Sequence, residues 1–158
     1  MSFIKDNDND NYETNKSGWE NIKQYIPKNK IIWSPFYCDG KQKEYFKELG
    51  FDIIHEDKDF FSYTPDYDLI IDNPPFSKLR SICEKLKQLD KPFIMIMPSS
   101  KINAVWFQKM FHKHLQIIIP LNKKINFTNI NPDITFNFNW GIYYFCYKIN
   151  LNKDLIFI

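Results

Sequence analysis

No long hydrophobic run occurs in this sequence. No apolar stretch of the 158-residue chain reaches about 18 residues, the length that a membrane-spanning helix needs, and the first residues contain no apolar segment typical of an export signal. The three cysteines, Cys38, Cys83 and Cys146, are odd in number and far apart, which predicts reduced thiols instead of a disulfide framework. We therefore expect a soluble, intracellular protein that is neither secreted nor bound to a membrane.

A metal site is not predicted either, and the charge is close to balanced. His112 and His114 are near neighbours, but no cysteine or carboxylate pair stands at the spacing of zinc ligands. The net charge of +2 permits nucleic-acid binding without arguing for it. In contrast, 44% of the residues are hydrophobic and 18% are aromatic, which is enough to build a packed, ring-rich core in one domain.

The stretch Asp68–Phe76 is the most informative part of the chain. Residues 69–71 form an apolar run without polar alternation, as expected of a strand buried on both faces of a parallel sheet. Two consecutive prolines end this strand, because they fix φ and lack backbone donors. The carbonyls of residues 72–74 are therefore left as acceptors at the carboxyl edge of the sheet, next to the amide of Asn73 and the ring of Phe76. Together these groups suit a planar ring that bears an exocyclic amino group.

The rest of the chain alternates between predicted strands and helices. Strands are expected at residues 31–33, 51–55, 68–72, 93–97 and 115–119, and helices at residues 17–26, 45–49, 79–89 and 105–110. Fully apolar strands that alternate with helices indicate an α/β sandwich with a mostly parallel sheet. Residues 136–147 and 151–158 are rich in β-forming residues, which predicts an antiparallel C-terminal hairpin. Residues 125–134 are expected to form a long polar loop, typical of lids and contact surfaces.

The first residues differ in composition from the rest. Residues 1–16 are dominated by Asp, Asn and Lys, which cannot bury much surface, so a flexible N-terminal leader is expected there. Residues 17–158 are expected to form a single domain.

Two segments resemble a known family. The motif Asn73-Pro74-Pro75-Phe76, at the end of a buried strand, follows a Pro-Phe-Tyr-Cys-Asp-Gly turn at residues 35–40. This arrangement resembles the S-adenosylmethionine-dependent amino-methyltransferases, above all the adenine-N6 methyltransferases of small phage and virus types. The resemblance covers nearly all of residues 17–150, including the tail at residues 136–140. It implies a Rossmann-like methyltransferase sandwich with a seven-stranded sheet whose last strand is antiparallel, in the cytoplasm or a host-cell compartment.

The family's acceptor site implies catalytic roles for Asn73, Pro74, Pro75 and Phe76. An adenine amino nitrogen is a poor nucleophile, because its lone pair is delocalised into the ring. Hydrogen-bond acceptors favour a pyramidal, nucleophilic nitrogen, and Asn73 Oδ1 and the Pro74 carbonyl would be those acceptors. Phe76 would stack on the base, which must be flipped out of the helix if the substrate is duplex DNA.

The resemblance also implies a site for S-adenosylmethionine. In the family a glycine-rich turn approaches the cofactor, whereas here Gly40 is the only glycine of the turn, and Ser34 stands where an acidic residue is common. Acids after the second strand are placed to accept from ribose hydroxyls, and Asp59-Phe60 resembles the family's Asp-Phe pair that meets the cofactor adenine. The residues expected to bind cofactor are Ser34, Pro35, Phe36, Asp39, Gly40, Glu56, Asp57, Asp59, Phe60 and Asn73.

The predicted function is methyl transfer to the N6 amino group of adenine, in DNA more than in RNA. Related families with the same motif methylate RNA adenine, guanine N2 or a glutamine amide, and the eroded glycine turn also suits a catalytically silent, methyltransferase-like binding subunit. No Pro-Cys dipeptide occurs, so cytosine-C5 chemistry is not predicted. A separate recognition domain has no room, so target recognition is expected from residues 122–139 or from a partner subunit. Candidate nucleic-acid contacts are Lys123, Lys124 and Asn129, and a wider basic surface would add Lys101, Lys109 and Lys113.

Overall fold

The computed structural model describes residues 12–129, 131 and 141–158. Its helices, with η marking 3-10 helices, are α1 (Lys16–Glu20), η2 (Lys23–Tyr25), α2 (Gln42–Glu48), η3 (Phe76–Lys78), α3 (Leu79–Leu89), η4 (Ser99–Asn103), α4 (Val105–Phe111) and η5 (His112–His114). Its strands are β1 (Tyr12–Thr14), β2 (Ile32–Trp33), β3 (Ile53–Ile54), β4 (Leu69–Asp72), β5 (Phe93–Pro98), β6 (Leu115–Ile119), β7 (Phe127–Asn129), β8 (Ile142–Tyr147) and β9 (Leu155–Phe157).

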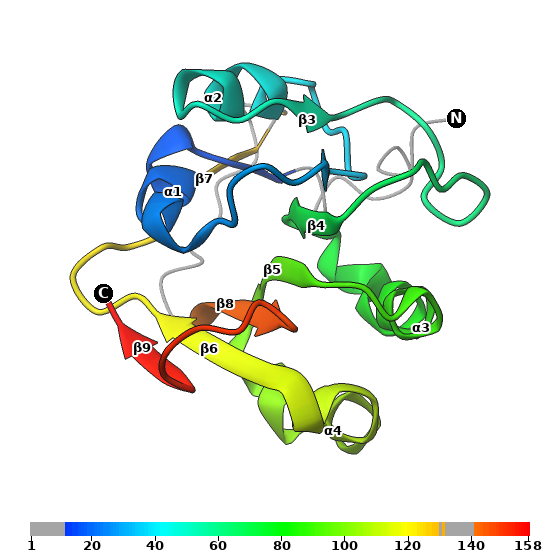
Figure 1. The fold of residues 1–158 in the computed structure, drawn as a ribbon, viewed down its shortest axis with the longest axis vertical. Coiled ribbons are helices and arrows are strands. Elements are labelled where there is room, and N and C mark those ends of the chain that lie inside the picture. Colours follow the sequence, from blue (N-terminus) through cyan, green and yellow to red (C-terminus); the bar gives the residue numbers. More distant parts are fainter. Residues whose placement is uncertain (1–11, 130, 132–140) are drawn as a thin grey trace.

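Within the described residues, seven strands form one sheet in the order β3-β2-β4-β5-β8-β6-β9 (Figure 1). All its pairings are parallel except the two made by β8, which runs antiparallel between β5 and β6. The fold is therefore mixed α/β with a mostly parallel sheet, and it is compatible with a Rossmann-like fold, as expected. Because β2, β4 and β5 are parallel, the loops that follow them lie at the same edge of the sheet.

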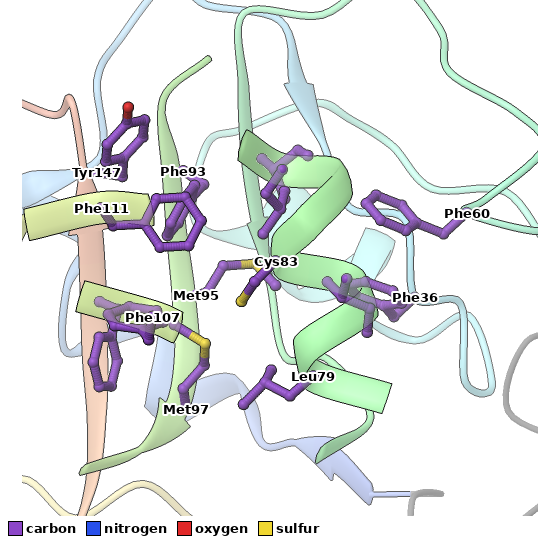
Figure 2. Close-up of a cluster of buried hydrophobic side chains, with 14 of the residues drawn as sticks. Phe36, Phe60, Leu79, Cys83, Phe93, Met95, Met97, Phe107, Phe111 and Tyr147 are labelled. Atoms are coloured by element: carbon purple, nitrogen blue, oxygen red, sulfur yellow. The ribbon is translucent and has the colours of Figure 1, made fainter. Parts of the chain in front are cut away.

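Side chains along β5 alternate between two hydrophobic clusters. Phe93, Met95 and Met97 pack with the buried faces of α3 and α4, as Figure 2 shows. Ile94 and Ile96 belong to the cluster on the other side, which contains residues from α1 and α2. Since both faces of this strand are covered by helices, each of its side chains up to residue 97 is buried, and the sequence therefore lacks polar alternation. In Figure 1, α3 and α4 accordingly lie on one side of the sheet, and α1 and α2 lie on the other.

The expected C-terminal hairpin is wrong. Strands β8 and β9 do not pair with each other, because β6 lies between them and pairs with both. The loop between them crosses the start of β6, where the Gln116 amide accepts the Leu151 N–H (2.7 Å) and donates to the Leu151 carbonyl (2.9 Å). This places β9 parallel to β6 at the outer edge. The antiparallel strand of the sheet is thus the second last, not the last.

The N-terminal boundary lies earlier than expected. Residues 12–16, expected within a flexible leader, form β1 and begin α1, and β1 pairs antiparallel with β7. Strand β7 in turn lies inside the expected long loop at residues 125–134. The expected helix at residues 17–26 is divided into α1 and η2, although its apolar side is buried as predicted. The tail at residues 136–140 lies outside the described residues. No helix in the described part of the chain is long and apolar enough to cross a membrane.

Candidate active site

Asn73 follows β4 directly and has one free acceptor atom. Its Nδ2 donates to the carbonyl of Tyr12 in β1 (3.3 Å), which orients the side-chain amide. The other end of the amide, Oδ1, is buried and has no hydrogen-bond partner. Pro74 and Pro75 are buried, and the Pro75 carbonyl accepts the Lys78 N–H (3.2 Å), which starts η3. The motif therefore presents one unpaired amide oxygen at the carboxyl edge of the sheet.

Asp72, the last residue of β4, joins this motif to the turn after β2. Its side chain is 1% exposed. Oδ2 accepts the Phe36 N–H (2.6 Å), while Oδ1 accepts the Asn73 N–H (2.7 Å) and a hydrogen bond from Gln42 Nε2 (3.1 Å). Burial raises the pKa of Asp72 to about 7, against the opposing effect of these hydrogen bonds. One carboxyl group thus ties together β2, β4 and α2.

The turn after β2 contains half of the residues expected to bind cofactor. Ser34 is buried, its N–H donates to the Ile54 carbonyl (2.9 Å), and its hydroxyl accepts a hydrogen bond from Gln42. Pro35 and Phe36 are buried as well. Gly40 has a φ of +83°, and a Cβ there would lie 2.5 Å from the Tyr37 hydroxyl oxygen. The Tyr37 ring therefore occupies space that a glycine-rich turn would leave open.

The ribbon formed by β1 and β7 closes this part of the sheet edge. Hydrogen bonds of Asn15, the residue after β1, also join the two strands at one end of the ribbon. The Asn15 N–H donates to the Asn126 carbonyl (2.9 Å), and Thr128 Oγ1 donates to Asn15 Oδ1 (2.8 Å). Beneath it lies a cavity of about 10 Å³, roughly the room that one water molecule needs. The cavity is lined by Tyr12, Glu13, Thr14, Phe36, Tyr37, Cys38, Asp39, Gln42, Asp72, Asn73 and Pro75.

Buried oxygen atoms without a hydrogen-bond partner line this cavity, among them Glu13 Oε1, Thr14 Oγ1 and Asn73 Oδ1. Neighbouring side chains of a strand point to opposite faces. Thr14 packs its methyl group toward Gly18 in α1, whereas the Glu13 carboxyl group meets Asp39. Glu13 and Asn73 are thus the two acceptors most directly available to a ligand that carries N–H donors.

The carboxyl groups of Glu13 and Asp39 line the same cavity and shift each other's pKa. Burial, followed by the effects of Asp39, raises the pKa of Glu13 to about 7. For Asp39, burial acts in the opposite direction, but hydrogen bonds from Glu13 and Lys41 prevail and lower its pKa. Lys41 Nζ also forms an ion pair with Asp39 at 3.2 Å. Glu13 therefore holds its proton more tightly than Asp39 does.

The acids expected to meet the cofactor ribose lie away from this cavity. Glu56 accepts a hydrogen bond from the Tyr63 hydroxyl (2.9 Å) and forms an ion pair with Lys58 (3.1 Å), both of which lower its pKa. It lines an open groove along the outer edge of β3. Asp57 is exposed, and Asp59 Oδ1 accepts the N–H of residue 61 (3.1 Å) in a tight turn. None of the three is among the residues that line the cavity under the ribbon.

Phe60 is a core residue in this structure. Its ring is 1% exposed and packs against Trp33 and Phe36, with ring centroids 5.5 and 5.2 Å apart. Lys85 covers its other side, with Nζ 4.5 Å from the ring centroid. Phe60 thus supports the turn after β2 from below. Phe76, expected to stack on the base, is half-buried at the start of η3 and is not in the cavity lining.

The candidate nucleic-acid contacts do not form one surface. Lys123 and Lys124 are exposed in the loop after β6, at the same sheet edge as Asn73. Asn129 is buried, pairs with Tyr12 in the ribbon and accepts the N–H of residue 131 (2.7 Å). Lys109 and Lys113 line a groove with the C-terminal ends of α3 and α4, at the opposite sheet edge.

Several cavity residues were not expected from the sequence. They are Tyr12, Glu13, Thr14, Gln42 and Asp72. For Asp72, only the backbone carbonyl was expected at the site, not the carboxyl group. The first three lie in a segment whose polar neighbours obscure a three-residue strand, although Tyr and Thr are both favoured in strands. Gln42 stands at the start of a helix, where its sequence position gives no sign of a buried amide.

Neither the comparisons with known proteins nor a search for metal ligands among the described residues assigns a function to this site. No family model matches the chain, and no curated protein sequence matches it. Among the described residues, no group of three or more His, Cys, Asp or Glu side chains is arranged to hold a metal ion. Cys38, which lines the cavity, has a pKa raised to about 12 by burial and by the neighbouring carboxylates, so its thiol stays protonated.

Proposed function

We propose that this protein is an S-adenosylmethionine-dependent methyltransferase that acts on the N6 amino group of adenine in DNA. The observation that carries the proposal is the buried, unpaired Oδ1 of Asn73, held at the carboxyl edge of a mostly parallel sheet by an oriented amide. In α/β sheets of this type, ligands bind outside the carboxyl ends of the strands. The Asn-Pro-Pro-Phe resemblance supplies the reaction class.

The role of Asn73 follows from its geometry. An amide oxygen that is already desolvated and oriented accepts a hydrogen bond from an amino group without reorganising. It favours the pyramidal nitrogen that attacks a methyl group, and it stabilises the positive charge that develops there. Asp72 fixes the Asn73 backbone by accepting its N–H at 2.7 Å. Proton loss from the nitrogen follows as its charge develops, so no strong base is required beforehand.

The side chains around the cavity fit S-adenosylmethionine, which supplies an electrophilic methyl group when bound. The unpaired acceptor at Glu13 suits a ligand that carries an ammonium group and a sulfonium charge. The ionised Asp39 adds a negative charge at the same cavity. A cavity of about 10 Å³ is far below the roughly 300 Å³ of small-ligand sites. Only a group the size of one water molecule therefore enters this cavity, and the rest of such a ligand lies outside it.

A second candidate function is a catalytically silent, methyltransferase-like binding subunit. The specific observation in its favour is the Tyr37 ring, which fills the space beside Gly40 in the turn expected to approach the cofactor. In this alternative, the unpaired oxygens hold an ordered water molecule in the cavity of about 10 Å³. The acceptors RNA adenine, guanine N2 and glutamine amide remain alternatives within the methyltransferase class.

Two experiments separate the two functions. Calorimetry measures binding of S-adenosylmethionine, and an assay with tritiated S-adenosylmethionine then measures methyl transfer. We expect binding, and label in duplex or single-stranded DNA that contains adenine but not in matched DNA without it. Nucleoside analysis should identify N6-methyladenine. Absence of binding at millimolar cofactor would contradict the enzyme and favour the silent subunit. Label in RNA or in a glutamine-containing peptide, but not in DNA, would move the proposal to those acceptors.

A further inference from the structure

Strand β9 is an edge strand whose outer side pairs with no strand in the described part of the chain. It forms one edge of the seven-stranded sheet, and β3 forms the other (Figure 1). On its inner side, the Asp154 carbonyl accepts an N–H of β6 (2.8 Å), and the Ile158 N–H donates to a carbonyl of β6 (3.0 Å). Alternate residues of a strand direct their backbone groups to the same side. The N–H and carbonyl groups of Leu155 and Phe157 therefore point outward, away from β6.

The two residues with outward-facing backbone groups also have exposed apolar side chains. Leu155 is 54% exposed and Phe157 is 58% exposed, whereas Ile156 between them is buried. Leu121 is 64% exposed, and its N–H donates to the Ile158 carbonyl just after β9 (2.7 Å). A single exposed apolar side chain is normal, but neighbouring ones mark a contact surface. The outer side of β9 therefore combines unpaired backbone groups with an apolar patch.

The features that usually prevent pairing at a sheet edge are present at β3 but not at β9. Natural proteins protect an edge strand with charged residues or proline. Lys43, Asp52 and Glu56 line the groove along the outer edge of β3. Residues 155–158, in contrast, contain no charged residue and no proline. An unprotected edge of this kind is suited to pair with another extended strand.

The geometry of this edge matches a second copy of itself. In an antiparallel pair, two opposite residues whose backbone groups face each other exchange two hydrogen bonds. A two-fold axis beside Ile156 places Leu155 of each copy opposite Phe157 of the other. Every outward-facing N–H of β9 then donates to an outward-facing carbonyl of the second copy, and none is left over. Because a two-fold axis brings residues near it close to their own copies, a charge there would meet an equal charge, and β9 has none.

We propose that β9 pairs antiparallel with β9 of a second copy, which forms a symmetric dimer whose two sheets are continuous. Leu155 and Phe157 are cross-strand neighbours in this pairing, so the four side chains of the two copies form one apolar patch. An interface of this length buries far less than the roughly 2,000 Å² of permanent dimers, so the dimer is in equilibrium with monomers. The dimer is independent of the proposed function, because no residue of β9 lines the cavity under the ribbon.

The direction of β9 decides where the two candidate active sites lie in the dimer. Strand β9 is parallel to β6, and β6 and β5 are both antiparallel to β8, so β9 runs in the same direction as β5 and β4. Antiparallel pairing of the two β9 strands reverses this direction in the second copy. The two Asn73 residues therefore lie at opposite ends of the strands in the joined sheet. Each site faces its own substrate, and the dimer does not bring both sites to one short stretch of a duplex.

Sedimentation velocity at protein concentrations from about 5 to 500 µM tests the self-association. We expect the mass to rise from that of a monomer to that of a dimer and no further. Phe157→Lys should weaken the dimer at least about tenfold, because it removes an apolar contact and places two positive charges near the two-fold axis. Val105→Lys, at a 63% exposed apolar position on α4, is the matched control and should dimerise as the wild type does.

A second variant and hydrogen exchange locate the interface. Leu155→Pro removes an outward-facing N–H without removing a hydrogen bond to β6, so it should weaken the dimer while β9 stays in the sheet. Amide exchange at Leu155 and Phe157 should slow only at high protein concentration. The Ile156 amide, which faces β6, should be protected at every concentration.

Four results would overturn the proposal. The wild type remains a monomer up to the highest concentration, or it associates beyond two copies. The dimer of Phe157→Lys is as stable as the wild-type dimer while the variant melts as the wild type does, which decides the matter even where the proline variant does not fold. Exchange slows at the amides of β3 instead of β9, so another edge is the interface. Exchange slows at Leu155 but not at Phe157, which excludes the register with the axis beside Ile156.

Discussion

The carboxyl group of Asp72 accepts the backbone N–H of Phe36 at 2.6 Å, from the end of one strand to the turn after its neighbour. Phe36 lies in the half of the site that the resemblance assigns to cofactor, and Asp72 directly precedes Asn73 in the half assigned to the acceptor. Ser34 stands at the end of β2, where an acidic residue is common in the family that the chain resembles. The acid that holds the turn therefore comes from β4 instead of β2.

Replacing Asp72 with Asn should destabilise the fold. The Asn amide offers one acceptor oxygen in place of two, so its nitrogen would face an N–H donor of Phe36 or Asn73. Leaving a buried donor unpaired in such a network costs about 2–4 kcal/mol. Urea denaturation of wild type, D72N and the exposed control Asp66→Asn measures the difference. A loss no larger than that of the control would show that the Asp72 hydrogen bonds do not hold the two strand ends together.

Replacing Asn73 with Ala should abolish methyl transfer while leaving the affinity for S-adenosylmethionine within a few-fold of wild type. The lost group is a preoriented acceptor for the substrate amine, and removal of one such group typically lowers kcat by about 10²–10³. Single-turnover transfer and calorimetry measure the two effects separately. Asn103→Ala, at the exposed last residue of η4, is the control. A collapse of cofactor affinity together with loss of transfer would instead make Asn73 a structural residue.

Replacing Gly40 with Ala should destabilise the protein more than replacing Gly50 with Ala. Both glycines have positive φ, +83° and +93°, so each substitution carries the backbone cost of about 1–2 kcal/mol. Only at Gly40 does the new Cβ meet an atom, the Tyr37 hydroxyl oxygen at 2.5 Å, whereas nothing lies within 4 Å at Gly50. Thermal melts should show the order wild type, G50A, G40A. Adding Tyr37→Ala to G40A should remove the difference between the two glycine variants, and equal losses in the single variants would contradict the close approach of Tyr37.

The stability of the free protein should depend on the protonation of Glu13. Its pKa is about 7 in the folded state and 4.5 as a model value, so the folded state holds the proton more tightly. This contribution is fully present below pH 4.5 and is lost as pH rises through 7. Glu13→Gln mimics the protonated form and should therefore match the wild type at pH 4.5 and melt a few degrees higher at pH 8. A variant that melts lower than wild type at pH 8 would show that the charged carboxylate stabilises the fold.

Local sequence patterns were sufficient to predict individual strands and helices of the core. The apolar run at residues 69–71 and the prolines after it predict a buried strand and its end, because burial on both faces and missing donors are local properties. The spacing of Leu79, Ile82 and Leu86 predicts α3, whose buried face carries these residues. The motif at residues 73–76 likewise marked the edge of the sheet where the cavity lies.

Strand partners and the wall of the site were decided only by the tertiary structure. The periodicity of a sequence indicates which side chains of a strand are buried, but not which strand is its neighbour in the sheet. The sequence therefore predicts that β9 pairs with β8, whereas in the structure β9 pairs with β6. The ribbon joins Tyr12 to Asn129, residues far apart in the chain, through backbone hydrogen bonds that most sequences can make. Its pairing with β7 brings Glu13 to Asp39 and the Tyr12 carbonyl to Asn73. The motif at residues 73–76 could therefore be predicted from the sequence alone. Glu13, which lines the same cavity, becomes part of the site only when the folded chain pairs β1 with β7.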